Sequence, residues 1–131
     1  YKGLDILLKS MNLVLSKEKN IELLIVGENY DSIVKYKKII NDSLYKNKIH
    51  FFNNYIEDSD LKYWFSASDL VVQPYKKSSQ SGITPLTFQF EVPTVVTNVG
   101  GLSEQITDKV NGFICKHNFQ DLAEKIAKDT F

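Results

Sequence analysis

The sequence predicts an α/β fold in which a parallel sheet lies between two layers of helices. Short apolar runs rich in β-branched residues alternate with longer segments whose apolar residues recur every three or four positions. This alternation is typical of short βαβ units, whose right-handed crossovers place helices on both faces of a sheet. The 131 residues correspond to one domain, and about a third of them are Leu, Ile, Val or Phe, which is enough for a substantial core.

The strands are expected where short apolar runs end in Gly, Asn or Pro, and the helices where apolar residues share one face. In the first helix, Leu4, Leu7, Leu8 and Met11 have this spacing. The predicted strands are 21–26, 49–52, 69–73, 93–97 and 112–115. The predicted helices are 4–15, 31–45, 58–66, 82–90, 103–107 and 119–128. We therefore expect a Rossmann-like, three-layer αβα arrangement with one parallel sheet.

The composition excludes several classes of function. The 16 basic residues, all of them Lys, balance 16 acidic ones, which argues against a broad basic face for nucleic acid. Because Arg is absent, a site that needs a guanidinium must be completed from elsewhere. The one cysteine, Cys115, excludes an internal disulfide, and with His50 and His117 it is too sparse for a metal site. No apolar run approaches the ~18 residues that cross a bilayer.

The loops that follow the predicted strands are the candidate ligand-binding segments, because ligands bind beyond the carboxyl ends of parallel strands. The longest, 74–84, carries Ser81 and Gly82 to a helix start. Free N–H groups there can bind phosphate without a cation; the alternative is an ordinary Ser-capped helix. Gly100-Gly101 is a second turn where the backbone can approach a ligand, or merely a tight connection.

Other nucleotide and hydrolase motifs are absent. The sequence has neither G-x-G-x-x-G nor G-x-x-x-x-G-K-[ST], and Ser78, Ser79 and Ser81 lack the G-x-S-x-G setting of a nucleophile. A phospho-receiver domain would need acidic residues clustered at strand ends. Only Glu28 and Asp69 are candidates, and Asp69 stands at the start of its strand, on the wrong edge of the sheet.

Taken in order, these loops resemble the C-terminal half of the retaining glycosyltransferases of family 4. Those enzymes have the GT-B architecture, two Rossmann-like domains with the active site between them. The matching segments are Lys2-Gly3, Ile25-Val26-Gly27, 67–75, 80–83, 93–104 and 111–113. The 74–82 segment resembles a subgroup common in bacterial cell-surface polysaccharide clusters.

The resemblance implies a site for a nucleotide-diphosphate sugar. Lys2 would stabilise the donor diphosphate together with the N–H groups of Ile83 and Thr84, and Gly27 would border the nucleotide. Backbone groups of 54–56 would contact the base. The complete implied donor site is Lys2, Gly27, Asn54, Tyr55, Ile56, Gln80, Ser81, Gly82, Ile83, Thr84, Thr87, Gly100 and Gly101.

The sequence departs from the family pattern at Asn53, where Gly is usual, and at a pair of glutamates. Many members carry two Glu separated by seven residues, of which the second contacts the donor ribose. Counted from Gly82, these positions hold Ser79 and Thr87; counted from Pro93, they hold Ser78 and Leu86. Neither register supplies a carboxylate. Thr87 or Gln89 would then contact the ribose.

We therefore expect residues 1–131 to be one nucleotide-sugar-binding domain, cut from a longer two-domain enzyme whose N-terminal acceptor domain is absent. The expected activity is retaining transfer of a hexose to a glycan or lipid-linked acceptor. The expected location is cytoplasmic, with peripheral contact at the inner face of the membrane. No cofactor or metal is expected, because helix N-termini and Lys2 would replace the cation at the diphosphate. The alternative is a non-catalytic subunit of this fold that scaffolds or activates a true transferase.

Overall fold

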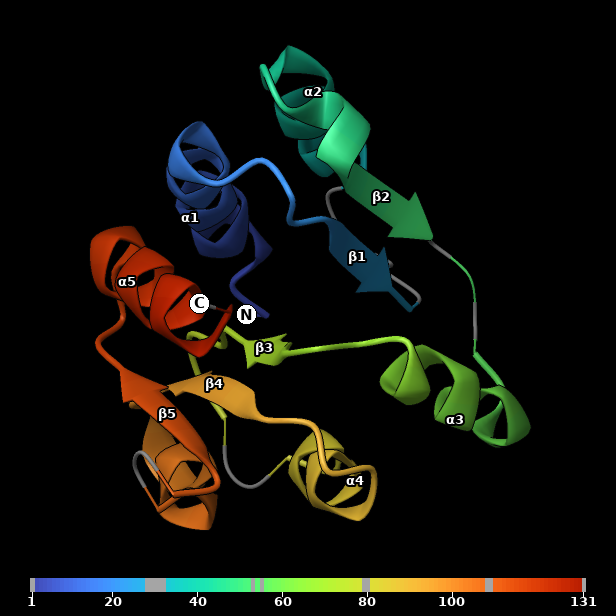
Figure 1. Ribbon diagram of the computed structural model, residues 1–131, viewed down its shortest axis with the longest axis vertical. Coiled ribbons are helices and arrows are strands. Elements are labelled where there is room, and N and C mark those ends of the chain that lie inside the picture. Colours follow the sequence, from blue (N-terminus) through green and yellow to red (C-terminus); the bar gives the residue numbers. More distant parts are fainter. Residues whose placement is uncertain are drawn as a thin grey trace.

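The computed structural model describes residues 2–27, 33–52, 54, 56–78, 81–107 and 110–130 (Figure 1). The chain alternates helices and strands as the sequence predicts. The helices are α1 (Leu4–Lys17), α2 (Ile33–Asp42), α3 (Asp58–Ser66), α4 (Ile83–Gln89) and α5 (Phe119–Thr130), with 3-10 turns η1 (Lys46–Lys48) and η2 (Gly100–Gln105). The strands are β1 (Leu23–Val26), β2 (Ile49–Phe52), β3 (Val71–Gln73), β4 (Thr94–Thr97) and β5 (Gly112–Cys115).

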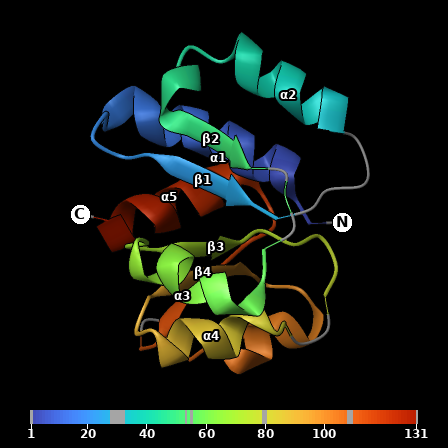
Figure 2. The same ribbon diagram turned by 90° about the vertical axis from the view of Figure 1, so that its right-hand side faces the viewer.

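The strands form two parallel ladders, β1-β2 and β3-β4-β5. The predicted Rossmann-like arrangement of parallel strands is confirmed, with the strands divided between these two ladders. β1 and β3 lie beside each other in both views without pairing (Figures 1 and 2). The reason is local: β3 is three residues long, and all of its ladder partners belong to β4. The order 2-1-3-4-5 places the topological switch between β1 and β3.

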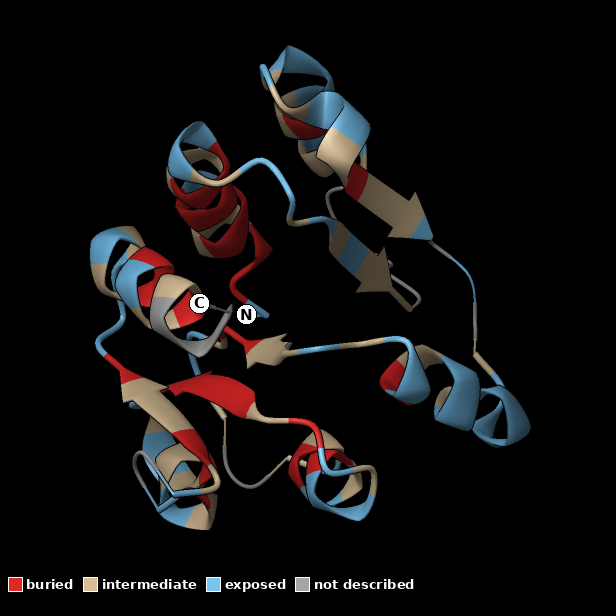
Figure 3. Ribbon diagram, viewed as in Figure 1, coloured by how far each residue is buried: buried red, intermediate tan, exposed pale blue. Residues whose placement is uncertain are grey.

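Two helices hold the two ladders together. α1 and α5 pack along each other and over the strands, and their apolar faces supply most of the main core. Leu8, Leu15 and Leu122 are at most 1% exposed. Val95 of β4 and Ile49 of β2 belong to the same core, so it spans both ladders. Figure 3 shows buried residues concentrated in α1 and β4.

The other face of the β3-β4-β5 ladder carries a smaller core. Val96 of β4 meets Leu102 and Ile106, from η2 and the residue after it. The rings of Phe65 in α3 and Phe90 after α4 stack with centroids 5.5 Å apart, which joins α3 to α4. Helices therefore cover both faces, which confirms the predicted three layers.

Element boundaries differ from the predictions by a few residues. The 3-10 turn η2 begins at Gly100 rather than at 103, because the Gly pair permits a tight turn directly after β4. The ladder of β4 begins at Thr94 rather than Pro93, since proline has no N–H to donate. The Pro93 carbonyl still accepts a hydrogen bond from Val71 N at 3.0 Å.

Candidate functional site

The N-terminal segment lies against the loop that follows β3, at the edge where the parallel strands end (Figure 2). Gly3 has φ 77°, and a Cβ built there would lie 1.7 Å from the Pro74 carbonyl oxygen. Only glycine fits this position, both for its left-handed backbone and for this contact. The adjacent Lys2 is exposed, with its ammonium 4.9 Å from the centroid of the Tyr75 ring, within cation–π range.

An ion pair strengthens this contact. Lys76 Nζ lies 3.0 Å from Asp5 Oδ2 in the first turn of α1. Burial favours the neutral carboxyl, but the hydrogen bond and charge of Lys76 outweigh it and keep the pKa of Asp5 below its ordinary value. The ion pair and the contact of Gly3 with Pro74 thereby hold Lys2 close to the loop after β3.

The loop reaches α4 through Ser81 and Gly82. Ser81 Oγ accepts a hydrogen bond from Ile83 N at 3.1 Å. The carboxamide of Gln105 forms two more bonds to the backbone of Ser81, accepting from its N–H at 2.9 Å and donating to its carbonyl at 3.2 Å. No atom of the described residues lies within 4 Å of a Cβ built on Gly82. The start of α4 thus borders open space, where a ligand can approach the backbone.

A buried polar cluster lies beneath this turn. Gln73 Nε2 donates to the hydroxyls of Thr84 and Thr94 at 3.1 and 3.2 Å, and Thr87 Oγ1 donates to the Thr84 carbonyl at 2.7 Å. All four side chains are buried, and Gln73 Oε1 has no hydrogen-bond partner among the described residues. The cluster ties the first turn of α4 to β3 and β4.

A groove of about 650 Å³ runs between α3 and α4, next to Gly82. Polar residues of α3, Asp58, Ser59 and Lys62, face Leu86 and Gln89 of α4 across it. Leu86 thus lines the groove, whereas the Thr87 side chain is fully buried on the face toward the sheet. In the structure, Gln89 is therefore better placed than Thr87 to meet a ligand in this groove.

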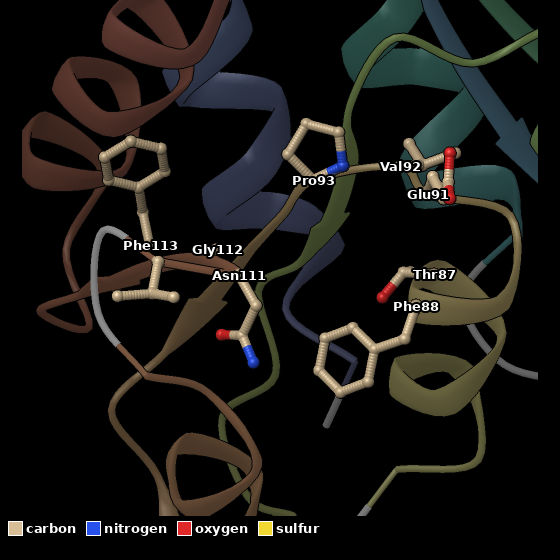
Figure 4. Close-up of a pocket in the computed structure, with 9 residues that line it drawn as sticks. Thr87, Phe88, Glu91, Val92, Pro93, Asn111, Gly112 and Phe113 are labelled. Carbon is tan, nitrogen blue, oxygen red and sulfur yellow. The ribbon is translucent and has the colours of Figure 1, made fainter.

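A second pocket, of about 540 Å³, lies at the opposite edge of the sheet (Figure 4). Phe88 of α4 faces Asn111 and Gly112 across it, where β4 and β5 begin. Thr87 borders this pocket too. The predicted diphosphate-binding turn at Ser81-Gly82 lies at the other end of α4, so this pocket is separate from it.

The other predicted site residues either lie in loops that follow strands or fall outside the described residues. Gly27 follows β1 with φ 131°, and no atom of the described residues lies within 4 Å of a Cβ built there. Its N–H donates to the Phe52 carbonyl at 3.1 Å. Asn54 and Ile56 follow β2, and Gly100-Gly101 begins η2 after β4. All of these loops leave the carboxyl ends of strands. Tyr55 and Gln80 lie outside the described residues.

The sequence reasoning missed Gln105. No motif marks it, because its partner is the backbone of a residue 24 positions away. The matching segment 93–104, which contains Gly100-Gly101, ends directly before it. Cys115 is buried, and burial raises the pKa of its thiol to about 12, which makes it a packing residue. Among the described residues, no three His, Cys, Asp or Glu side chains lie together as a metal site would require.

Two relatives from Staphylococcus aureus share parts of this sequence. "Protein CapJ" of Staphylococcus aureus is 27% identical over 110 residues, which cover 81% of this chain and 27% of that protein. "Capsular polysaccharide biosynthesis glycosyltransferase CapM" of Staphylococcus aureus is 25% identical over 138 residues, 97% of this chain and 33% of that protein. The chain thus spans about a third or less of the length of these relatives.

Solved structures share the fold. The C-terminal domain of a glycosyl transferase group 1 family protein (LpcC) from Francisella tularensis has a TM-score of 0.85 at 19% identity, covering 97% of this chain and 68% of that one. Anabaena Alr3699/HepE in complex with UDP also has a TM-score of 0.85, at 20% identity, covering 98% and 35%. A glycosyltransferase from Rickettsia africae has a TM-score of 0.86 at 25% identity, covering 99% and 34%.

These structures identify the fold as the Rossmann-like C-terminal half of a GT-B protein. In the described part of the chain, no helix is long and apolar enough to cross a membrane. The family described as "Glycosyl transferases group 1" matches residues 1–128. The chain belongs to the group 1 glycosyltransferase family.

Proposed function

We propose that this chain binds the donor of a retaining glycosyltransferase that moves a hexose from a nucleotide-diphosphate sugar to a glycan or lipid-linked acceptor. The observation that carries the proposal is the contact of the Lys2-Gly3 segment with the loop that delivers Ser81-Gly82 to α4. It brings an ammonium and the start of a helix to one strand edge. Family membership supports the same activity, as do the neighbours of this fold solved with UDP and UDP-glucose.

The proposed chemistry is electrostatic. Negative charge develops on the diphosphate when the sugar–oxygen bond breaks. The Lys2 ammonium and the N–H groups of Ile83 and Thr84 would stabilise that charge. The open space beside Gly27 and Gly82 would let the phosphates approach the backbone. In this proposal the leaving nucleotide needs no metal ion, so chelation should leave binding unchanged.

The nucleoside would extend into the groove between α3 and α4. Leu86 lines that groove where a ribose-binding carboxylate is common in the family, so the polar contacts would come from Gln89 and from the α3 side. We propose Gln89 rather than Thr87 for the ribose, because the Thr87 hydroxyl is already bonded to Thr84 inside the core. The base would lie toward the residues after β2, near Asn54 and Ile56.

The acceptor and the remaining catalytic groups would come from an N-terminal domain, and a lipid-linked acceptor would bring the protein to the cytoplasmic face of a membrane. The chain covers a third or less of the length of its relatives, which supports the proposal of an N-terminal domain. The second candidate function is a non-catalytic subunit that activates another transferase. The absence of Glu at positions 78, 79, 86 and 87 favours it.

The deciding experiment is calorimetry of the full-length protein with UDP, GDP, ADP and CMP and their sugars, with and without EDTA. We expect saturable binding of one nucleotide class, unaffected by EDTA. Lys2→Ala and Gly82→Val should each weaken it about tenfold or more, since tenfold corresponds to ~1.4 kcal/mol. Lys9→Ala, an exposed lysine of α1, is the matched control and should bind normally. A well-folded protein that binds none of the nucleotides would favour the non-catalytic subunit.

A further inference from the structure

The two hydrogen bonds between Gln105 and Ser81 are unusual in their arrangement. One carboxamide accepts from the Ser81 N–H at 2.9 Å and donates to the Ser81 carbonyl at 3.2 Å. Both backbone polar groups of a single loop residue are thereby satisfied. This is the pattern by which two paired residues of antiparallel strands exchange both bonds. The Gln105 carboxamide thus pairs with the Ser81 backbone as a residue of a neighbouring strand would.

The residue held in this way is the last one before the N-cap of α4. Gly82, at the N-cap, has no side chain to cap the helix, so the orientation of the first turn depends on the residue before it. Ser81 Oγ accepts from Ile83 N. Fixing the Ser81 backbone therefore fixes the serine oxygen and, with it, the direction of the first N–H groups of the helix.

The other end of this contact is anchored in the core. Gln105 is the last residue of η2, between Leu102, which is fully buried, and Ile106, which is also buried. η2 begins at Gly100-Gly101, directly after β4. The Gln105 contact therefore joins the loop after β3 to the turn after β4, two loops that the chain itself connects only through α4 and β4.

We infer that Gln105 is a positioning residue that holds the 81–83 turn in the geometry that receives the donor diphosphate. This inference rests on the proposed function. A turn fixed before the ligand arrives loses less conformational entropy when it binds, so the contact should appear as affinity. A carboxamide is required at this length: an ionised Glu has no donor, Met has neither group, and Asn is one methylene shorter.

The first test compares Gln105→Met with Gln120→Met in the full-length protein. Gln120 is an exposed glutamine of α5 and serves as the matched control. We expect Gln105→Met to raise the Kd for the nucleoside diphosphate selected from the calorimetric panel about tenfold, consistent with the loss of two hydrogen bonds. It should also speed amide hydrogen exchange in peptides that contain Ser81, without ligand. Gln120→Met should match the wild type in both measurements.

The second test uses the pH dependence of Gln105→Glu. An ionised carboxylate repels the Ser81 carbonyl, whereas a protonated carboxyl presents one donor and one acceptor, as the carboxamide does. The ratio of the Kd of Gln105→Glu to that of the wild type should therefore be about ten at pH 8 and fall toward one as the pH drops below about 4, where the carboxyl is protonated. Taking the ratio to wild type removes the titration of the phosphates themselves.

The outcomes separate the inference from the proposed function. If the wild type binds no nucleotide, the proposed function is overturned. If the wild type binds but Gln105→Met binds and exchanges as Gln120→Met does, the inference alone is overturned. A constant Kd ratio for Gln105→Glu across this pH range would contradict the hydrogen-bond explanation and overturn it as well.

Discussion

At the scale of single residues, two glycines of the site serve different needs. Gly3 has a left-handed backbone and touches the Pro74 carbonyl, so its role is to let two segments meet. Gly82 has an ordinary φ of −69°, and no described atom lies near a Cβ built there, so its proposed role is to leave room for the donor. The sequence marks both as glycine but does not distinguish these roles, because the distinction depends on what lies opposite each one.

This difference predicts opposite responses to the same substitution. Gly3→Ala places a methyl group against Pro74 and forces a left-handed conformation, so we expect the free energy of unfolding to fall by about 3 kcal/mol or more. Gly82→Ala, as the control, should leave it within about 0.5 kcal/mol. Urea denaturation followed by circular dichroism measures both. Equal stability of the two variants would show that the contact with Pro74 is absent in solution.

Cys115 gives a second prediction at this scale. Burial raises the pKa of its thiol to about 12, so the folded protein should react slowly with iodoacetamide at pH 8 and quickly in urea. In the unfolded chain the thiol ionises near pH 9. Stability should therefore be constant below that value and decline as pH rises from about 9 toward 12. A Cys115→Ala variant should lack this contribution, and fast labelling of the folded wild type would contradict the prediction.

At the scale of elements, periodicity predicted the helices well where one face is buried. The spacing of Leu7, Leu8 and Met11 in α1 is confirmed, because burying that face is what stabilises the helix. η2 was predicted to begin at 103 and begins at Gly100. Periodicity has no signal in so short a turn, and the contact of Gln105 with Ser81 depends on tertiary placement.

The packing of α5 on α1 carries its own prediction. Leu122 is 0% exposed in the main core, and Leu122→Ala should lower the free energy of unfolding by about 2–5 kcal/mol through lost burial and a cavity. Val34 of α2, 78% exposed, is the control, and Val34→Ala should change stability little. Urea midpoints at constant slope measure the difference. A small effect at Leu122 would mean that the two helices separate easily.

At the scale of the whole molecule, the strand order placed the candidate site more reliably than any single motif. Parallel strands bring their carboxyl ends to one edge, so the loops bearing Gly27, Gly82 and Gly100 could be located from the sequence alone. The residues of α4 that face the groove could not be predicted from the sequence alone. Leu86 lines the groove between α3 and α4, whereas the next residue, Thr87, is buried. Which of the two faces the groove depends on how α4 packs against the sheet.

The Asp5–Lys76 pair links α1 to the loop after β3 and predicts a pH effect. The lowered pKa of Asp5 means that its contribution to stability is present above the unfolded value near 3.9 and is lost as pH falls through the folded value. Asp5→Asn should therefore be less stable than wild type at pH 7, by less than about 1 kcal/mol because the pair is partly exposed.

At pH 3 and below the two proteins should converge, and added salt at pH 7 should narrow the difference. Thermal unfolding at both pH values measures it. A difference that persists unchanged at low pH would assign the effect to packing rather than to charge.

The gap between the two ladders has a consequence for how the protein opens. No backbone hydrogen bond of the described strands joins β1-β2 to β3-β4-β5, so the connection depends on side chains of α1 and its neighbours. The two ladders can therefore separate without the loss of any hydrogen bond within either ladder. In native-state hydrogen exchange, β1 and β2 should open as one cooperative unit at lower free energy than β4 and β5. The loop after β2, which we propose contacts the base, would then loosen first, while the turn after β3 that we propose for the diphosphate keeps its shape.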